Sequence, residues 1–470
     1  MINSFIYNKI LEYFPFEPTG EQSKALEALS NFIVSPRKDM ILLFKGYAGT
    51  GKTTMLGATV KAVNLLKQKT VLLAPTGRAA KVFSEYAEHN ACTIHKKIYR
   101  KKSFSDDFRG FVLLENLHKD TLFIVDEASM ISNEPAEINV FGSGHLLDDL
   151  IKYVYSGENC KAILLGDTAQ LPPVSLNESP ALNARYLERY NLQVTEIELT
   201  QVVRQSQDSG ILLNATNIRD ALRNGKIGMY PNICTENYPD VKKIRGDELI
   251  EEISSSYGKT GIDDTMVICR SNKNANIYNN GIRNRILYRE EEISSGDRLM
   301  VVKNNYYWPD TGNDSDFIAN GETVRVLRVR RMEEMYGFRF CNVWVAFEDY
   351  GTETELKIML DALSSESPAL TREQNSSLFA AVNENYAHIQ NKRERMKKIK
   401  NDPYFNALQV KYAYAVTCHK AQGGQWSNVF LDIGYVTEEM MGEDFYRWLY
   451  TAFTRATRKL FLVNWRLGKI

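Results

Sequence analysis

The sequence predicts an α/β protein with parallel sheets in two domains, the second of which is interrupted by a small inserted β unit. The first observation is a series of short apolar runs, separated by helix-like stretches, in the first 200 residues. Strands that are apolar throughout are typical of a parallel sheet, because helices cover both of its faces. The four runs in this part of the chain are residues 40–44, 71–74, 122–125 and 162–165.

The second half of the chain repeats this pattern around an interruption. Residues 322–360 alternate apolar and polar side chains, which indicates a small antiparallel barrel, and residues 371–400 are polar with a helical pattern. Further apolar runs occur at 266–269, 412–416, 429–431 and 460–463. We therefore expect a first domain over residues 1–200 with a hairpin insertion at about 98–119, a second domain over 201–295 and 411–470, and an inserted β domain over 296–410 with a helical extension at about 365–405.

The bulk composition is that of a soluble globular protein, and it excludes several classes of protein. The 58 basic and 58 acidic side chains cancel, so a nucleic-acid surface would have to arise from local sorting of charge. The six cysteines form no CxxC pair, which argues against a zinc site or a disulfide framework. No run approaches the roughly 18 apolar residues of a membrane span, and residues 1–18 make a poor signal peptide. We expect a cytoplasmic protein.

A phosphate-binding loop is the most specific local signal. The segment Gly46-Tyr47-Ala48-Gly49-Thr50-Gly51-Lys52-Thr53 follows an apolar run and opens a helix, as such a loop requires. Its glycines let backbone N–H groups wrap a phosphate, and the helix N-terminus adds partial positive charge. We expect Lys52 to reach the β- and γ-phosphates of ATP and Thr53 to hold Mg²⁺. A chance glycine turn is the alternative, which the strand–loop–helix context disfavours.

Two further strand ends carry polar residues suited to hydrolysis. Asp126 and Glu127 follow the run at 122–125, where Asp126 could bind Mg²⁺ and Glu127 could polarise the attacking water. Gln170 follows the run at 162–165 and could orient that water or sense the γ-phosphate, since an amide both donates and accepts. The alternatives are an acidic pair that caps a helix and a simple turn.

Two arginines, Arg204 and Arg455, are candidates for the γ-phosphate region. A planar guanidinium matches phosphate oxygens in a bidentate way, and an arginine placed across a cleft makes hydrolysis depend on closure. For each arginine, a surface ion pair is the alternative.

Eight motifs in one order resemble the superfamily-1 helicases, in particular the 5′-to-3′ branch that contains the RecD-like and Dda-like helicases. The resemblance runs from about residue 19 to residue 463. It implies two RecA-like domains with ATP between them, an SH3-like inserted barrel, a pin hairpin, and a monomer that moves on single-stranded DNA and unwinds duplex junctions. The motifs are GYAGTGKTT, LLAPTGRAAK, TIHK, IVDEAS, LLGDTAQLPPV, LTQVVRQ, VTCHKAQGGQ and YTAFTRATRKL.

The resemblance also implies roles for individual residues at the nucleotide. Gln22 would read adenine, and ATP would bridge Lys52 to Arg455 on the other domain. Gly423 and Gln425 follow the stretch 419–422, which would couple nucleotide to DNA. The catalytic set would be Lys52, Asp126, Glu127, Gln170, Arg204 and Arg455. The nucleotide-binding set would be Gln22, Gly46, Ala48, Gly49, Thr50, Gly51, Lys52, Thr53, Thr54 and Gly423, with Thr53 and Asp126 on Mg²⁺.

Hydroxyl and imidazole groups make up most of the DNA contacts that the resemblance implies. Such groups position phosphates without reading sequence. The two histidines could instead be satisfied structural residues. The residues are Pro75, Thr76, Thr93, His95, Thr417 and His419.

Two segments leave alternatives open. In the hairpin, which also carries Arg100, Lys101 and Lys102, one of Phe104, Phe108 and Phe111 could stack on the terminal base pair, or these rings could pack the hairpin onto its own domain. The basic stretch 391–400 could be a solvated helix face or a contact with DNA or a partner. Three rival functions also stay open: a translocase that strips proteins without unwinding, an RNA-directed motor, and a binding module with a vestigial ATPase.

Overall fold

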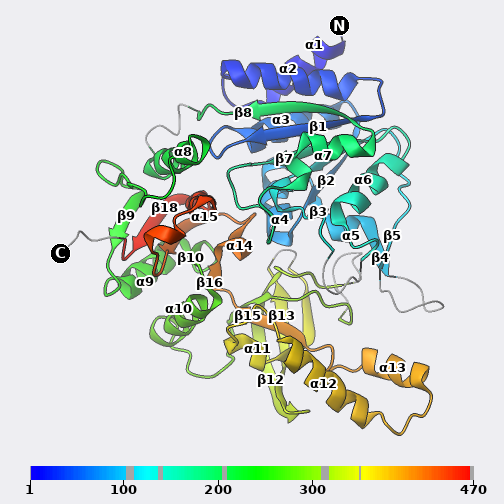
Figure 1. Ribbon diagram of the computed structural model, residues 1–470, viewed down its shortest axis with the longest axis vertical. Coiled ribbons are helices and arrows are strands. Elements are labelled where there is room, and N and C mark those ends of the chain that lie inside the picture. The colour runs from blue at the N-terminus through cyan, green and yellow to red at the C-terminus, as the bar shows by residue number, and fades with distance from the viewer. Residues whose placement is uncertain are drawn as a thin grey trace. The chain divides into compact units, whose positions relative to one another are not determined.

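The computed structural model describes residues 2–101, 111–135, 141–203, 209–308, 317–348 and 351–465 (Figure 1). Contacts divide the chain into two compact units. The first unit comprises Met1–Lys242, Gln422–Gln425 and Val436–Leu460, and the second comprises Lys243–Ala421, Trp426–Tyr435 and Phe461–Ile470. These two units do not have the same bounds as the predicted domains, whose boundaries stay a prediction.

A six-stranded parallel sheet forms the centre of the first unit, with the order β3-β2-β6-β7-β1-β8 (Figure 1). The four predicted apolar runs are confirmed as β1, β2, β6 and β7. The edge strands β3 and β8 were not predicted, although β8 alternates apolar and polar residues as half-buried strands do. The bounds are β1 Met40–Gly46, β2 Lys69–Ala74, β3 Ala91–Thr93, β6 Thr121–Val125, β7 Lys161–Gly166 and β8 Gln193–Leu199.

Helices cover this sheet because its strands are apolar on both sides. Leu42 and Phe44 of β1 share one buried cluster with residues of α1 (Ile2–Tyr13), α2 (Gly20–Val34) and α3 (Lys52–Leu65). The remaining helices of this part of the chain are α4 Gly77–Ala87, α5 Ile94–Ile98, α6 Leu146–Ser156, α7 Ala184–Leu187 and α8 Gly210–Arg223.

A second sheet has the order β16-β10-β17-β18-β9, and β10 pairs in parallel with both β16 and β17. The predicted runs at 266–269, 429–431 and 460–463 are confirmed as β10, β17 and β18. The strands are β9 Val241–Ile244, β10 Thr265–Cys269, β16 Ala415–Thr417, β17 Trp426–Asp432 and β18 Ala456–Val463, and the helices of this region are α9 Leu249–Thr260, α10 Asn272–Arg285, α14 Cys418–Ala421 and α15 Glu443–Phe453.

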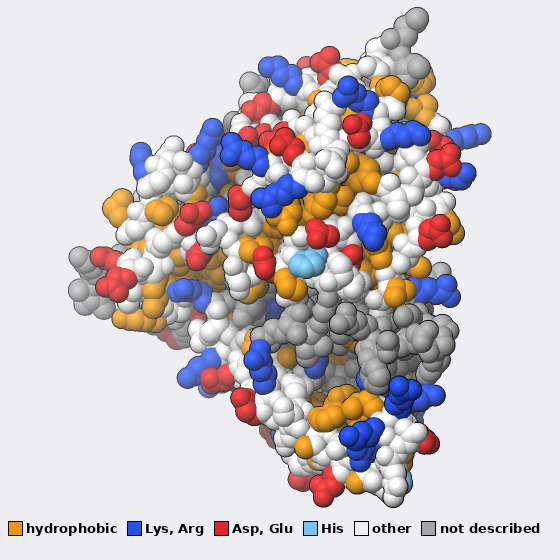
Figure 2. Space-filling view, turned by 45° about the vertical axis from the view of Figure 1, so that its right-hand side comes forward, with side chains coloured by type: hydrophobic (Ala, Val, Ile, Leu, Met, Phe, Trp, Pro, Cys, Tyr) orange, Lys and Arg blue, Asp and Glu red, His pale blue; other side chains and the backbone are white. Residues whose placement is uncertain are grey.

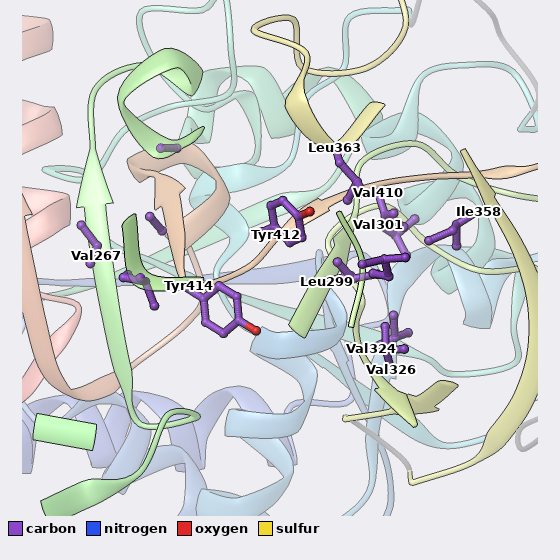
Figure 3. Close-up of a cluster of buried hydrophobic side chains, with 14 of the residues drawn as sticks. Val267, Leu299, Val301, Val324, Val326, Ile358, Leu363, Val410, Tyr412 and Tyr414 are labelled. Atoms are coloured by element: carbon purple, nitrogen blue, oxygen red, sulfur yellow. The ribbon is translucent and has the colours of Figure 1, made fainter. Parts of the chain in front are cut away.

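The predicted small barrel is confirmed as a closed five-stranded barrel, β11-β12-β13-β14-β15. Its strands pair antiparallel except β14 and β15, which run parallel. Buried side chains such as Leu299, Val324, Ile358 and Val410 fill its interior (Figure 3). The strands are β11 Arg298–Val301, β12 Thr323–Met335, β13 Phe338–Phe347, β14 Glu353–Met359 and β15 Leu408–Tyr412.

The single strand predicted at 412–416 is wrong, because the structure splits it between two sheets. Tyr412 ends β15 of the barrel, and Ala415 begins β16 of the second sheet. The side-chain oxygen of Asn279, on α10, accepts hydrogen bonds from the N–H groups of Tyr414 (3.0 Å) and Ala415 (2.8 Å). This amide satisfies the backbone donors at the break, and buried donors need such a partner. Figure 3 shows the rings of Tyr412 and Tyr414 on either side of the break.

The predicted helical extension forms α12 (Arg372–Asn385) and α13 (Lys392–Lys400), which follow the short helix α11 (Asp361–Ser364). Leu378, Val382 and Ile399 of the extension share a small buried cluster with barrel residues. Lys and Arg side chains gather on the surface around α12 and α13 (Figure 2). Within the described part of the chain, no helix has both the length and the apolar character needed to cross a membrane.

Candidate nucleotide site and DNA-contact residues

The P-loop connects β1 to α3 in the backbone conformation that phosphate binding requires. Gly49 and Gly51 have φ angles of 75° and 85°, in the region that favours glycine. No side chain caps the N-terminus of α3, so the first N–H groups of this helix face the loop without a side-chain acceptor. An uncapped helix N-terminus beside a glycine loop suits an anion such as a phosphate.

A cavity of about 390 Å³ lies against the P-loop, and every residue that lines it belongs to the first unit. The lining brings together most of the residues predicted from separate motifs. They are Ala48, Gly49, Gly51, Lys52, Thr53, Thr54, Asp126, Glu127, Gln170, Gly423, Gln425 and Arg455.

Lys52 is half-buried in this site and turns back onto the loop. Its Nζ donates hydrogen bonds to the carbonyl oxygens of Tyr47 (2.9 Å) and Gly46. Burial lowers the pKa of Lys52, and Asp167, Glu127 and Asp126 oppose that shift. A Cβ at Gly46 would lie 2.9 Å from the Lys52 side chain, so a larger residue there would crowd this lysine.

Asp126 and Glu127 follow β6, at the carboxyl end of the sheet. Burial, followed by the neighbouring charge of Glu127, raises the pKa of Asp126 above its usual range. Glu127 adopts a positive φ of 50°, which is uncommon for a residue other than glycine and turns its side chain out of the strand direction. Two adjacent carboxylates in a buried site favour a bound cation, as Mg²⁺ chemistry requires.

Arg455 lies in the same site and contacts Glu127. Its guanidinium is 3.6 Å from the Glu127 carboxylate, and its side chain is only 3% exposed. It also donates to the carbonyl oxygens of Thr451 (3.2 Å) and Gly424 (3.3 Å). The segment Val436–Leu460 groups with the first unit, so Arg455 and Lys52 belong to the same compact unit.

Gln170 lines the cavity and carries a buried acceptor atom without a partner among the described residues. Its side chain is 7% exposed, and Oε1 is buried without a hydrogen-bond partner among the described residues. Buried polar atoms are nearly always paired, so an orphaned acceptor in a cavity wall indicates a ligand or an ordered water. The predicted role of Gln170 in orienting water is consistent with this position.

Gln22 is already engaged within the protein. Its Oε1 accepts from the Thr19 N–H (3.0 Å) as part of the capping box of α2, and its Nε2 donates to the Thr50 carbonyl (3.0 Å). The Gln22 amide therefore stabilises the P-loop through its bond to Thr50. Its role in reading adenine stays a prediction. Thr50 is fully buried and donates to the Tyr47 carbonyl, so its side chain shapes the loop.

The predicted DNA contacts of the first unit lie where β2 and β3 end. Thr76 and Thr93 each cap a helix: their hydroxyls accept from the N–H groups of Ala79 (3.2 Å) and Lys96 (3.2 Å). Gly423 lies close to Thr76, because a Cβ added at Gly423 would come within 3.2 Å of the Thr76 hydroxyl. A predicted nucleotide residue and a predicted DNA residue are thus near neighbours. Pro75, directly before Thr76, is partly exposed.

His95 lies in an aromatic cluster. Its ring is 4.9 Å from that of Phe141 and 5.8 Å from that of Tyr99, centroid to centroid. Burial lowers the pKa of His95 to about 4, so the imidazole is neutral at neutral pH. His95 could therefore offer DNA a hydrogen bond but no positive charge.

The predicted contacts of the second unit follow β16. His419 is exposed on α14, and Thr417 lines a small hollow with Asn276, Lys411 and Lys420. Sequence reasoning missed the two lysines, although Lys420 sits inside the motif VTCHKAQGGQ. Burial is the main cause that lowers the pKa of each lysine to about 8, and the charge of Lys420 adds to the shift at Lys411.

Two models of known protein domains match the chain. The model of the AAA domain matches residues 19–232, and that of the UvrD-like helicase C-terminal domain matches residues 412–463. Both matches agree with the resemblance of the chain to the superfamily-1B helicases. The chain is a P-loop ATPase that uses ATP.

Individual relatives of the chain are distant. The chain is 25% identical over 444 residues to the ATP-dependent DNA helicase dda of Enterobacteria phage T4, covering 89% of this chain and 93% of that one. It is 24% identical over 455 residues to the ATP-dependent RecD2 DNA helicase of Deinococcus radiodurans, covering 94% of this chain but 48% of that one. A solved structure of two Pif1 helicases at forked duplex DNA shares the fold, with a TM-score of 0.50, 16% identity, and coverage of 96% of this chain and 93% of that one.

The structure describes the base of the predicted hairpin. Strands β4 (Tyr99–Lys101) and β5 (Phe111–Leu113) pair antiparallel. Phe111 is buried, with its ring 4.9 Å from Phe141, so this aromatic packs the hairpin onto its own unit. The other two candidate rings, Phe104 and Phe108, and the predicted γ-phosphate residue Arg204 lie outside the described residues.

Proposed function

We propose that this helicase moves along single-stranded DNA and separates duplex DNA ahead of it, in the 5′-to-3′ direction, by hydrolysing ATP. The observation that carries the proposal is the convergence of Lys52, Asp126, Glu127, Gln170 and Arg455 on one cavity beside an uncapped helix N-terminus. The phage T4 and Deinococcus relatives, which are named as ATP-dependent DNA helicases, support DNA as the track. Direction rests on family resemblance, and a monomer is proposed on the same ground.

The residues around the cavity fit ATP with Mg²⁺. We propose that the P-loop N–H groups and Lys52 hold the β- and γ-phosphates, and that Thr53 and Asp126 hold the metal. Mg²⁺, when bound, neutralises charge on the phosphates. Glu127 would polarise the attacking water, Gln170 would orient it through its free Oε1, and Arg455 would exchange its contact with Glu127 for the γ-phosphate.

We also propose that DNA is held alternately by Thr76 and Thr93 of the first unit and by Thr417 and His419 of the second. The hollow beside Thr417 supports this role for the second unit. The Lys420 ammonium lines it with no hydrogen bond or ion pair to any described residue, while the Lys411 ammonium is held by the carbonyl oxygens of Ala362 and Ser365. A half-buried ammonium without a carboxylate partner favours an anion, and a DNA phosphate supplies one.

Replacing Lys420 with glutamine is expected to weaken binding of single-stranded DNA and leave ATP affinity unchanged. Loss of one phosphate contact should reduce the slope of log K against log salt concentration by about 0.7. Fluorescence anisotropy over a range of salt concentrations measures this slope. Lys259→Gln is the matched control, because Lys259 is exposed at the end of α9. An unchanged slope for Lys420→Gln would remove Lys420 from the DNA site.

Duplexes with a single-stranded tail at either end test the proposed function. We expect ATP-dependent strand separation on substrates with a 5′ tail and little on substrates with a 3′ tail. Strand separation from 3′ tails alone would reverse the direction. ATP hydrolysis stimulated by single-stranded DNA without strand separation would favour the protein-stripping translocase, and stronger stimulation by RNA would favour the RNA-directed motor.

A further inference from the structure

Tyr450 on α15 reaches from the C-terminal motif into the P-loop. Its side chain is 1% exposed and is among the largest fully buried side chains of the described residues. Its hydroxyl accepts a hydrogen bond from the Ala48 N–H (2.9 Å) and donates one to the Asp167 carboxylate (2.6 Å). One phenol group therefore joins the P-loop to the segment that follows β7.

Asp167 also forms hydrogen bonds within the turn that carries Gln170. The other carboxylate oxygen of Asp167 accepts from the Ala169 N–H (2.9 Å), and its backbone carbonyl accepts from the Gln170 N–H (3.3 Å). These two hydrogen bonds stabilise the turn that carries Gln170, which lines the cavity. A shift of the P-loop relative to Tyr450 would therefore move Gln170, the residue proposed to orient water.

The neighbours of Tyr450 hold the same turn. The Thr451 hydroxyl accepts from the Leu171 N–H (2.9 Å), and the Arg447 guanidinium donates to the Thr168 carbonyl. The Gln422 amide donates to the Leu171 carbonyl (2.7 Å). Helix α15 ends at Phe453, two residues before Arg455. Helix α15 therefore connects three segments of the site: the P-loop, the turn that carries Gln170, and the segment that leads to Arg455.

We propose that Tyr450 is a positioning residue for ATP hydrolysis. Its hydroxyl holds the turn that carries Gln170 and the segment that carries Arg455 in fixed positions relative to the P-loop. This inference rests on the proposed function of the nucleotide site. Tyr450 touches no reacting atom, so it acts through Asp167 and Ala48. Its neighbour Tyr446, one helical turn earlier, is also buried, but its hydroxyl donates to the Met229 carbonyl (2.7 Å). Tyr446 therefore shows what a purely structural tyrosine of this helix does.

The test compares Tyr450→Phe with Tyr446→Phe. Both variants keep the ring and lose one hydroxyl, and Tyr450→Phe should lower the melting temperature more, because it removes two hydrogen bonds and Tyr446→Phe removes one. Tyr450→Phe should also lower kcat for DNA-stimulated ATP hydrolysis by about 10- to 100-fold, because catalytic groups lose rate when they are misplaced by about 1 Å. Its KM for ATP should change less than about threefold, since the phosphate-binding N–H groups and Lys52 remain. Tyr446→Phe should keep its kcat.

A double-mutant cycle with Asp167→Asn shows whether the two residues act as one connection. We expect Tyr450→Phe to add little to the kcat loss of Asp167→Asn. Equal kcat for Tyr450→Phe and Tyr446→Phe, or additive losses in the cycle, would overturn the inference. Wild-type protein without DNA-stimulated ATPase activity would instead overturn the proposed function. The two failures are therefore distinct.

Discussion

Replacing Lys52 with alanine is expected to abolish DNA-stimulated ATP hydrolysis, with a loss of at least about 10³-fold. Among the described residues that line the cavity, Lys52 is the one lysine, and its ammonium donates to carbonyl oxygens of the P-loop. Without it, the phosphates lose their direct positive partner in a buried site, where electrostatic interactions are strong. Steady-state ATPase assays with saturating single-stranded DNA measure the effect.

Lys61→Ala is the matched control for this prediction. Lys61 lies on the same helix and pairs with Glu88 on the surface, 2.8 Å away. A surface ion pair contributes little to stability, so this variant should keep its activity. If Lys52→Ala retained full activity while its fold was intact, the nucleotide site would have been assigned to the wrong cavity.

Replacing Arg455 with alanine is expected to separate binding from hydrolysis. Nucleotide affinity should stay near that of the wild type, because the P-loop and Lys52 are untouched. Hydrolysis should fall by about 10³- to 10⁵-fold, the usual effect of losing an arginine that stabilises charge on the transferred phosphoryl group. Arg455→Lys should restore little, because an ammonium lacks the planar donor pair of a guanidinium. Binding of a fluorescent nucleotide analogue and single-turnover hydrolysis measure the two quantities.

The buried contacts of Arg455 supply the rival explanation. Its guanidinium also donates to the Thr451 and Gly424 carbonyl oxygens, so its loss could loosen this part of the structure. A parallel fall of affinity, hydrolysis and melting temperature would indicate a structural role. Arg458→Ala is the control, because Arg458 lies exposed on β18.

Local sequence was sufficient to predict the phosphate site. Strand β1, the P-loop and the start of α3 are contiguous, and glycine spacing and helix polarity act over a few residues. The acidic pair after β6 was predictable for the same reason, because a strand that is apolar throughout ends where its first charged residues appear. Strand β8 could also have been found, since Gln193–Leu199 alternates as an edge strand does.

Other features depend on contacts between residues far apart in the sequence. The run at 412–416 looks like one strand, but Asn279, more than 130 residues earlier, supplies the acceptor that lets the backbone leave the barrel at Ala413 and enter the second sheet. The sequence makes Phe111 a candidate for base stacking. In the structure, its ring packs against the ring of Phe141.

The sequence by itself predicted the family resemblance, the parallel sheets with an inserted barrel, and most of the residues that line the cavity, because each rests on short segments whose physics is local. Only the tertiary structure showed that Gln22 is occupied in bracing the P-loop, that Arg455 contacts Glu127, and that Tyr450 links the P-loop to Asp167. These pairings arise from burial and hydrogen-bond satisfaction between segments that lie dozens to hundreds of residues apart, and no spacing along the chain encodes them.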